Sequence, residues 1–253
     1  GGYESQWNDF DKYMPVLNHQ YLQATIPGNH ELYHSSQAAY VDATIYNQYY
    51  NNPKNGFEGR LNSSYYFKYN DILFIMLDTM PRSNNQPNYY EEQREWFGSV
   101  VENNPSQFII VMTHPGCYST GVYDSDVIDA LKDYSGYNKK DEEKGVVYLI
   151  AGSAGRKAYP ANKKDKFEVV LETPSADGQY CGSIVEVENG ILTLSYYDKS
   201  GNLRDTFEIK SNKKIDQNFD ANKFLDEVKV EFNETNYKNS IVWPDNAYGK
   251  IKN

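Results

Sequence analysis

Cysteine is almost absent from this sequence, which has only Cys117 and Cys181 among its 253 residues. This scarcity excludes a disulfide framework and a cysteine-rich zinc site, and it leaves open whether the two cysteines pair. Long apolar runs are absent too, so no stretch of the sequence predicts a transmembrane helix. The balance of 25 Lys and Arg against 35 Asp and Glu, a net charge of −10, argues against binding to a nucleic-acid backbone. An anionic substrate would therefore need a bound cation to receive it.

Aromatic residues are abundant instead, with 24 Tyr and 11 Phe. Their large amphipathic side chains can fill a core or line a cleft, so we expect a folded protein. The length favours one domain, or one domain with an extension. Two Asn-x-Ser/Thr sequons, at Asn62 and Asn233, are compatible with export, and we expect an extracellular or cell-surface location.

The spacing of apolar residues predicts an α/β protein in which helices and strands alternate before a β-meander. Helical spacing runs from Trp7 to Leu22, and a short strand then ends at Pro27-Gly28. The later elements are a helix at 38–50, a hairpin at 63–79, a helix at 90–103, buried strands at 108–113 and 145–151, and a meander at 180–209. We predict two mixed β-sheets packed as a sandwich flanked by helices. They would form a domain of residues 1–210, followed by a mixed-charge extension at 211–253.

Polar side chains follow three of the predicted strands, at the point where each strand ends. Asn29 and His30 come after the first, Asp78 after the hairpin, and His114 after the strand that follows. Ligands of open α/β sheets bind beyond the carboxyl ends of strands, so this placement makes the four residues candidates for a site. Asparagine and histidine supply neutral oxygen and nitrogen donors that suit a divalent cation. A histidine that is not a metal ligand can protonate a leaving oxygen.

Several motifs occur in a fixed order along the chain. They are PGNHE at 27–31, YYFKYNDILFIMLDT at 65–79, EEQREWF at 91–97 and FIIVMTHPGCYS at 108–119. In sequence and spacing, the series resembles the calcineurin-like metallophosphoesterases, and within them the purple-acid-phosphatase branch. The resemblance implies a hydrolase of phosphate mono- or diesters that uses two metal ions, iron with zinc or manganese. Its substrate would be a small phosphate ester or a phosphorylated molecule.

The resemblance also assigns roles to individual residues. Asn29 would be a ligand of the second metal, His30 the acid that protonates the leaving group, and His114 a further metal ligand. The family has a His-x-Pro-x-Tyr pattern here; Tyr118 keeps its place, whereas Pro115 stands one position early. Tyr118 is therefore a candidate for shaping the substrate cleft. In such a centre two metals about 3.5–4 Å apart activate a hydroxide that attacks phosphorus in line.

Other parts of the family pattern are missing from the sequence. The family takes metal ligands from an early Asp-x-His and a Gly-Asp, which would precede residue 1, and from a later Gly-His-x-His. No histidine follows His114, and residues 124–144 are polar. We expect that the sequence lacks N-terminal strands and a segment near 128–144 that the natural protein has. The alternative is a family member that has lost its metals and serves as a binding or cell-surface module.

Structural roles are the alternative for each candidate residue. His30 and His114 could be hydrogen-bonded structural histidines, and Tyr118 could simply pack. Asp78 is a fallback ligand, although its counterpart in the resembled family is usually structural. Glu31 completes the Gly-Asn-His-Glu run, and we expect it to orient the loop through hydrogen bonds.

Overall fold

The structure is a computed structural model. It describes residues 4–32, 43–80, 89–114, 181–211, 229–233 and 238–242, together with Val147 and Leu149. The chain forms two compact units, one of Gly1–Pro115 with Ile215–Asn253 and one of Gly116–Lys214. The predicted strand at 145–151 lies outside the described residues, apart from Val147 and Leu149. Among the helices that the structure describes, none is both long and apolar enough to cross a bilayer.

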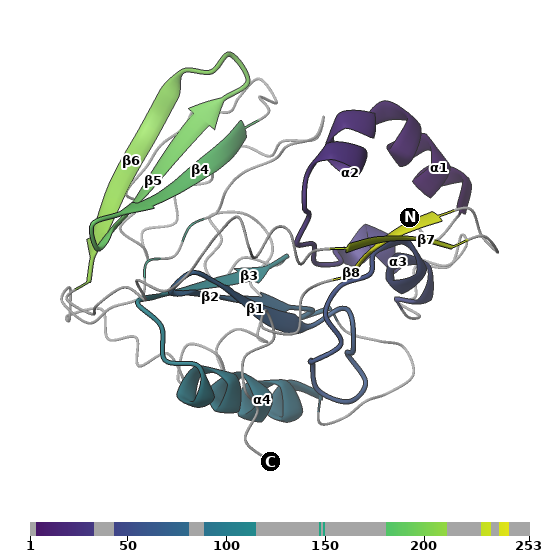
Figure 1. Ribbon diagram of the computed structural model, residues 1–253, viewed down its shortest axis with the longest axis horizontal. Helices are drawn as coiled ribbons and strands as arrows, with labels where there is room; N and C mark the ends of the chain where they lie inside the picture. Colours follow the sequence, from purple (N-terminus) through teal and green to yellow (C-terminus); the bar gives the residue numbers. More distant parts are fainter. Residues whose placement is uncertain are drawn as a thin grey trace, which may run out of the picture. The chain divides into compact units, whose positions relative to one another are not determined.

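A three-stranded sheet forms the framework of the first unit (Figure 1). β1 (Tyr65–Tyr69) pairs antiparallel with β2 (Ile72–Leu77), and β2 pairs parallel with β3 (Phe108–Thr113). Asn70 in the hairpin turn has φ of 53°, a left-handed conformation that asparagine tolerates. The predicted hairpin and the predicted strand after it are confirmed. Because β2 and β3 are parallel and in register, the residues that follow them emerge at the same edge of the sheet.

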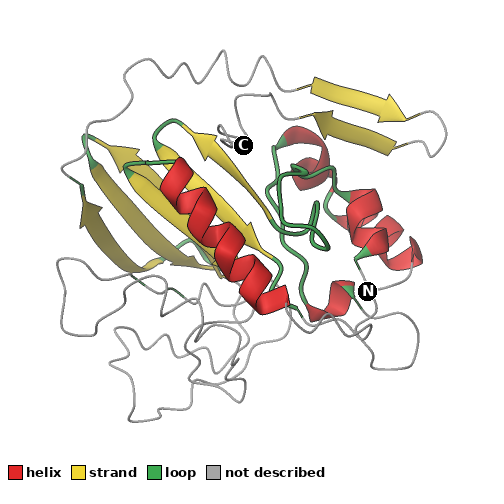
Figure 2. Cartoon of the chain, turned by 90° about the horizontal axis from the view of Figure 1, so that it is seen from below, coloured by secondary structure: helices red, strands yellow, loops and turns green. Residues whose placement is uncertain are grey.

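The helix α4 (Tyr89–Asn103) connects β2 to β3 and covers one face of this sheet, as Figures 1 and 2 show. Glu91 and Glu92 lie in its first turn, where the helix dipole favours acidic side chains. Trp96 packs against Tyr66 of β1, with 6.2 Å between the ring centroids. The predicted helix is therefore confirmed, and its aromatic contact with β1 shields the hairpin from water.

The opposite face of the sheet packs against the segment that leads into the PGNHE loop. Tyr65, Phe67 and Met76 form the buried cluster on this face. Ala24 and Ile26 of the incoming segment pack against that cluster. Burial of these apolar side chains fixes where the segment crosses the sheet, and therefore where the loop begins.

The short strand predicted in this incoming segment is wrong, because residues 22–28 form no strand. Side chains, not a neighbouring strand, bind its backbone at Thr25. The Thr25 carbonyl oxygen accepts hydrogen bonds from the hydroxyls of Tyr46 at 2.7 Å and Tyr65 at 2.9 Å. The Asn52 amide donates to the Tyr46 hydroxyl at 3.0 Å and so holds it in place. Buried carbonyls need a partner, and two tyrosines provide it here.

Three short helices precede the sheet: α1 (Glu4–Tyr13), α2 (Pro15–Gln20) and α3 (Thr44–Tyr49). The sequence predicted one helical stretch in place of α1 and α2. Pro15 divides it, because proline has no N–H with which to continue α1 and is favoured at the first position of a new helix. α3 lies within the predicted helix at 38–50, whose first residues are outside the described part of the chain.

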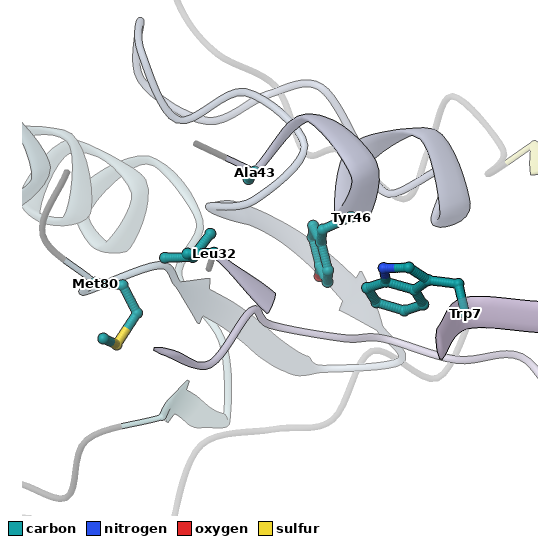
Figure 3. Packing of buried hydrophobic residues seen from close by; sticks show 5 residues of the cluster. All are labelled: Trp7, Leu32, Ala43, Tyr46 and Met80. Atoms are coloured by element: carbon teal, nitrogen blue, oxygen red, sulfur yellow. The ribbon is translucent and has the colours of Figure 1, made fainter. Parts of the chain in front are cut away.

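Side chains of α1 and α3 form a second buried cluster with residues that follow the PGNHE loop, precede α3 and follow β2, as Figure 3 shows. Its members are Trp7, Leu32, Ala43, Tyr46 and Met80. Leu32 directly follows the PGNHE loop and is fully buried. The loop is thus anchored at both ends, by the sheet contact before it and by this cluster after it.

The second unit contains the predicted meander. β4 (Cys181–Glu188), β5 (Ile191–Asp198) and β6 (Leu203–Lys210) form an antiparallel sheet in sequence order. The turn at Asn189-Gly190 has φ values of 51° and 78°, which match the two positive φ angles of a type I′ hairpin turn. The described residues therefore include two three-stranded sheets with helices, and the predicted α/β class is confirmed.

The predicted extension contains a hairpin that the sequence interpretation passed over. β7 (Lys229–Asn233) pairs antiparallel with β8 (Lys238–Val242). Alternating polar and apolar residues in the run KVEFN are the pattern of such a strand. The division into a domain at 1–210 and an extension at 211–253 stays a prediction.

Candidate metal-binding and catalytic site

The PGNHE loop is closed by its own glutamate. Asn29–Glu31 form a single 3₁₀ turn, η1, that starts at Gly28. The Gly28 N–H donates to Glu31 Oε2 at 2.9 Å, and the Glu31 N–H donates back to the Gly28 carbonyl at 3.2 Å. These reciprocal bonds give Glu31 the orienting role predicted for it, as in a capping box. They fix the direction in which Asn29 and His30 leave the turn.

The structure brings Asn29 and His114 together from positions 85 residues apart. His114 follows β3 directly, at the carboxyl edge of the sheet. Its Nε2 lies 3.1 Å from Asn29 Oδ1. An amide oxygen can only accept a hydrogen bond, so Nε2 carries the ring proton in this arrangement. Sequence placement alone suggested this meeting, and the structure contains it.

The spacing of these two atoms fits two adjacent ligands of one metal ion. Donors at about 2.0–2.1 Å from an ion, at a right angle to each other, are separated by roughly 3.0 Å. Asn29 Oδ1 and His114 Nε2 are 3.1 Å apart. In the part of the chain that the structure describes, no group of three or more His, Cys, Asp or Glu could hold a metal. These residues thus offer two donor atoms at this point, joined by a hydrogen bond whose proton Nε2 would have to release to bind a metal.

Close packing between Gly28 and His114 explains why glycine stands at this position. A Cβ on Gly28 would lie 2.9 Å from His114 Cε1 and 3.0 Å from both His114 Nδ1 and Glu31 Oε2. The Gly28 backbone has φ of −97° and ψ of −177°, which any residue can adopt. The requirement for glycine is thus the space taken by the imidazole, not an unusual backbone conformation.

Electrostatics favours the neutral form of His114. Removal from water lowers the pKa of its imidazole, the charge of Glu31 raises it, and the neighbouring His30 lowers it. Burial is the largest of these causes, so the pKa lies below its ordinary value of 6.5. A metal ligand has to be neutral, and this environment supplies that form near neutral pH. The His30 side chain is exposed.

Asp78 does not join this group. Its side chain is fully buried, with Oδ2 at 3.8 Å from Arg60 Nε. Its Oδ1 accepts the Met80 N–H at 3.2 Å. The Asp78 N–H donates to Ser64 Oγ at 2.9 Å. The carboxylate therefore stabilises the end of β2, and the structure supports its structural alternative over its use as a fallback ligand.

Sequence reasoning missed two features of the site, namely the contact between Gly28 and His114 and the bond between Thr79 and Thr113. The approach of His114 to Gly28 has no signature in the sequence beyond the glycine itself. Thr79 and Thr113 bond to each other, with 2.8 Å between their Oγ1 atoms. The sequence signal for that pair was that each of the two apolar strands is followed by or ends in a threonine. Tyr118 lies outside the described residues.

A protein-family model described as calcineurin-like phosphoesterase matches residues 2–152 of the chain. The matched region covers more than half of the sequence and includes Asn29, His30 and His114. No curated protein and no solved structure matches the chain.

Proposed function

The chain belongs to the calcineurin-like phosphoesterase family, and from this premise we propose a dinuclear, purple-acid-phosphatase-like hydrolase of phosphate mono- or diesters. Family membership supports a metal-dependent phosphoesterase in general terms, with divalent metals and phosphate-ester substrates. The proposal adds two metal ions, iron with zinc or manganese, which would supply an activated hydroxide, and an acid that would protonate the leaving group. It also includes an extracellular or cell-surface location.

The observation that carries the proposal is the meeting of Asn29 and His114. Two neutral donors, one oxygen and one nitrogen, lie 3.1 Å apart at the carboxyl edge of the sheet. They come from separate segments: the PGNHE loop lies between the two buried clusters, and His114 follows β3, which is paired along its length with β2. Such support holds ligands within the narrow tolerances that a metal site requires. Asn29 and His114 would therefore hold part of one metal.

Metal ions bound here would neutralise phosphate charge and lower the pKa of a bound water. The protein would supply the geometry of the site and the surrounding charge. A net charge of −10 repels an anionic substrate, so the attraction has to be local to the metals. Gly28 leaves the space that His114 needs beside Asn29.

His30 is proposed as the proton donor. It follows Asn29 directly in the η1 turn, and its side chain is exposed. Its imidazole lies near enough to His114 to influence the pKa of that ring. An exposed imidazole beside the ligand pair can reach the oxygen of a leaving group and give it a proton. Neutralising the departing alkoxide in this way would speed the release of poor leaving groups most.

The first test is the metal content of the purified full-length protein, measured by elemental mass spectrometry and paired with hydrolysis of p-nitrophenyl phosphate. Near two equivalents of metal with turnover would support the proposal. Asn29→Ala should reduce both, whereas Asn103→Ala, an exposed asparagine on α4, should change neither. Absence of both metal and turnover in the wild-type protein would overturn the proposal and favour a phosphoesterase fold retained for binding.

A further inference from the structure

A hydrogen bond between two threonines links the strand ends beside the candidate site. Thr79 Oγ1 lies 2.8 Å from Thr113 Oγ1. Thr79 is two residues beyond the end of β2, and Thr113 is the last residue of β3. The next residue is His114. The hydroxyl of Thr79 therefore bonds to the side chain immediately before a proposed metal ligand.

Thr79 stands on a buried, hydrogen-bonded part of this edge. It is 1% exposed, and the residue before it, Asp78, is 0% exposed. The Gln93 amide of α4 donates to the Asp78 carbonyl at 3.2 Å and to Ser64 Oγ at 3.0 Å. The helix, the hairpin and the end of β2 are thus tied together next to Thr79. A group held in this way can serve as a fixed reference point for a more mobile neighbour.

The end of β3 is more lightly packed. Val111 is 42% exposed and Met112 is 41% exposed, and His114 is also exposed. The strand end is paired with β2, where Thr113 stands opposite Leu77, while the side chains of Val111 and Met112 are exposed. The hydroxyl bond to Thr79 therefore adds a side-chain restraint to the backbone pairing that carries His114. Loss of one hydroxyl would leave the other without this partner, and a buried polar group without a partner is destabilising.

We propose that Thr79 is a positioning residue: its hydroxyl fixes Thr113 and so holds His114 in line with Asn29 for metal binding. The inference rests on the proposed function, because it takes His114 as a ligand. It goes beyond that function by placing one determinant of ligand geometry outside the PGNHE and histidine motifs. Thr79 acts on His114 through Thr113 and is not itself proposed to contact metal or substrate.

Thr79→Val, which keeps the shape and removes the hydroxyl, tests this role in the full-length protein. Two readouts are needed: the position of the His114 Hε1 resonance in the metal-free protein, assigned with His114→Gln, and the affinity for Mn²⁺. We expect a shifted resonance and roughly tenfold weaker Mn²⁺ binding, the low end of the effect of outer groups on metal sites. Thr79→Ser, which restores the hydroxyl, should recover both.

The matched control is Thr206→Val, which removes a cross-strand hydroxyl from the Ser195–Thr206 pair of the second unit. It should leave the His114 resonance and the Mn²⁺ affinity unchanged. If Thr79→Val does not fold, Thr113→Val removes the other half of the pair at a half-buried position. A wild-type resonance and wild-type Mn²⁺ affinity in the folded variant would overturn the role of Thr79. Failure of the wild-type protein to bind metal or hydrolyse ester would instead refute the proposed function, and the resonance would still test the positioning.

Discussion

Substitution of Gly28 by alanine should damage the candidate site and leave the fold nearly unchanged. The added Cβ would lie 2.9 Å from His114 Cε1 and 3.0 Å from Nδ1. Non-bonded carbon atoms are most stable at about 3.5–4.0 Å. The imidazole therefore has to move by roughly 0.5–1 Å, the difference between these distances. The movement separates His114 Nε2 from Asn29 Oδ1, which are 3.1 Å apart in the wild-type protein.

The expected cost in stability is small for two reasons. The Gly28 backbone angles, φ of −97° and ψ of −177°, are open to alanine, and the exposed His114 side chain can swing away. Glycine-to-alanine replacement also stabilises a protein by about 0.4–1 kcal/mol through the unfolded chain. This gain offsets part of the lost contact, and a change of 1 kcal/mol corresponds to about 2–4 °C in a chain of this size class. The melting temperature should therefore shift by less than about 4 °C.

Function should suffer much more than stability. Misplacement of a catalytic group by about 1 Å can cost 10²-fold in rate. We expect kcat/KM for p-nitrophenyl phosphate to fall by about 10–100-fold, and Mn²⁺ affinity to fall with it. Gly182→Ala is the matched control, since a Cβ on that residue meets nothing within 4 Å. Wild-type metal affinity and rate in Gly28→Ala would refute the steric reasoning, and so would an equal loss in Gly182→Ala.

The remaining predictions concern three side chains near the same loop. His30→Ala should slow hydrolysis of esters with poor leaving groups by about 10²–10⁴-fold and hardly affect those with good ones; equal losses in a leaving-group series would exclude it as the acid. His114→Ala should lower bound metal as well as turnover, and unchanged metal by elemental mass spectrometry would leave His114 a structural role. Burial, then the charges of Glu31 and Asp11, raises the pKa of Tyr50 from its ordinary value of 10.0 to about 12. Because the folded-state pKa is the higher one, its stabilising contribution is complete below pH 10 and is lost as pH rises towards 12. Tyr50→Phe should therefore flatten the fall in the free energy of urea unfolding over that range, and an unchanged slope would contradict the assignment.

The elements that could be predicted from the sequence are those in which the spacing of apolar residues and the flanking turn or capping residues indicate the same secondary structure. The β1–β2 hairpin has two strand-like runs on either side of a tight turn at Asn70, and α4 combines helical spacing with acidic residues in its first turn. The segment before the PGNHE loop has the same apolar character but no strand. Thr25 is bound there by Tyr46 and Tyr65, 21 and 40 residues away. Local composition indicates a buried segment, but not the kind of group that will bind its backbone.

The candidate site likewise has some features that the sequence predicts and others that it does not. The placement of Asn29 and His114 directly after predicted strands indicated that they would lie at one edge of the sheet. The fit of the imidazole over Gly28 and the bond between Thr79 and Thr113 could not be predicted, because each depends on the approach of separate segments to within about 3 Å. The threonine pair spans 34 positions and joins two different motifs, so neither motif alone indicates it. Short sequence motifs indicate which residues are candidate ligands, whereas the distances between those residues result from packing.

The meeting of Asn29 and His114 also has an entropic consequence. Bringing together the ends of an 85-residue stretch costs about 4 kcal/mol of loop-closure free energy. This free energy is offset in the metal-free protein by contacts elsewhere in the unit: the sheet, the tyrosine hydrogen bonds at Thr25 and the buried clusters. The two candidate ligands are therefore already together before any ion binds. Preorganisation of this kind makes metal affinity depend on the packing of the whole unit. A substitution that loosens the Trp7 cluster would then weaken metal binding without touching a ligand.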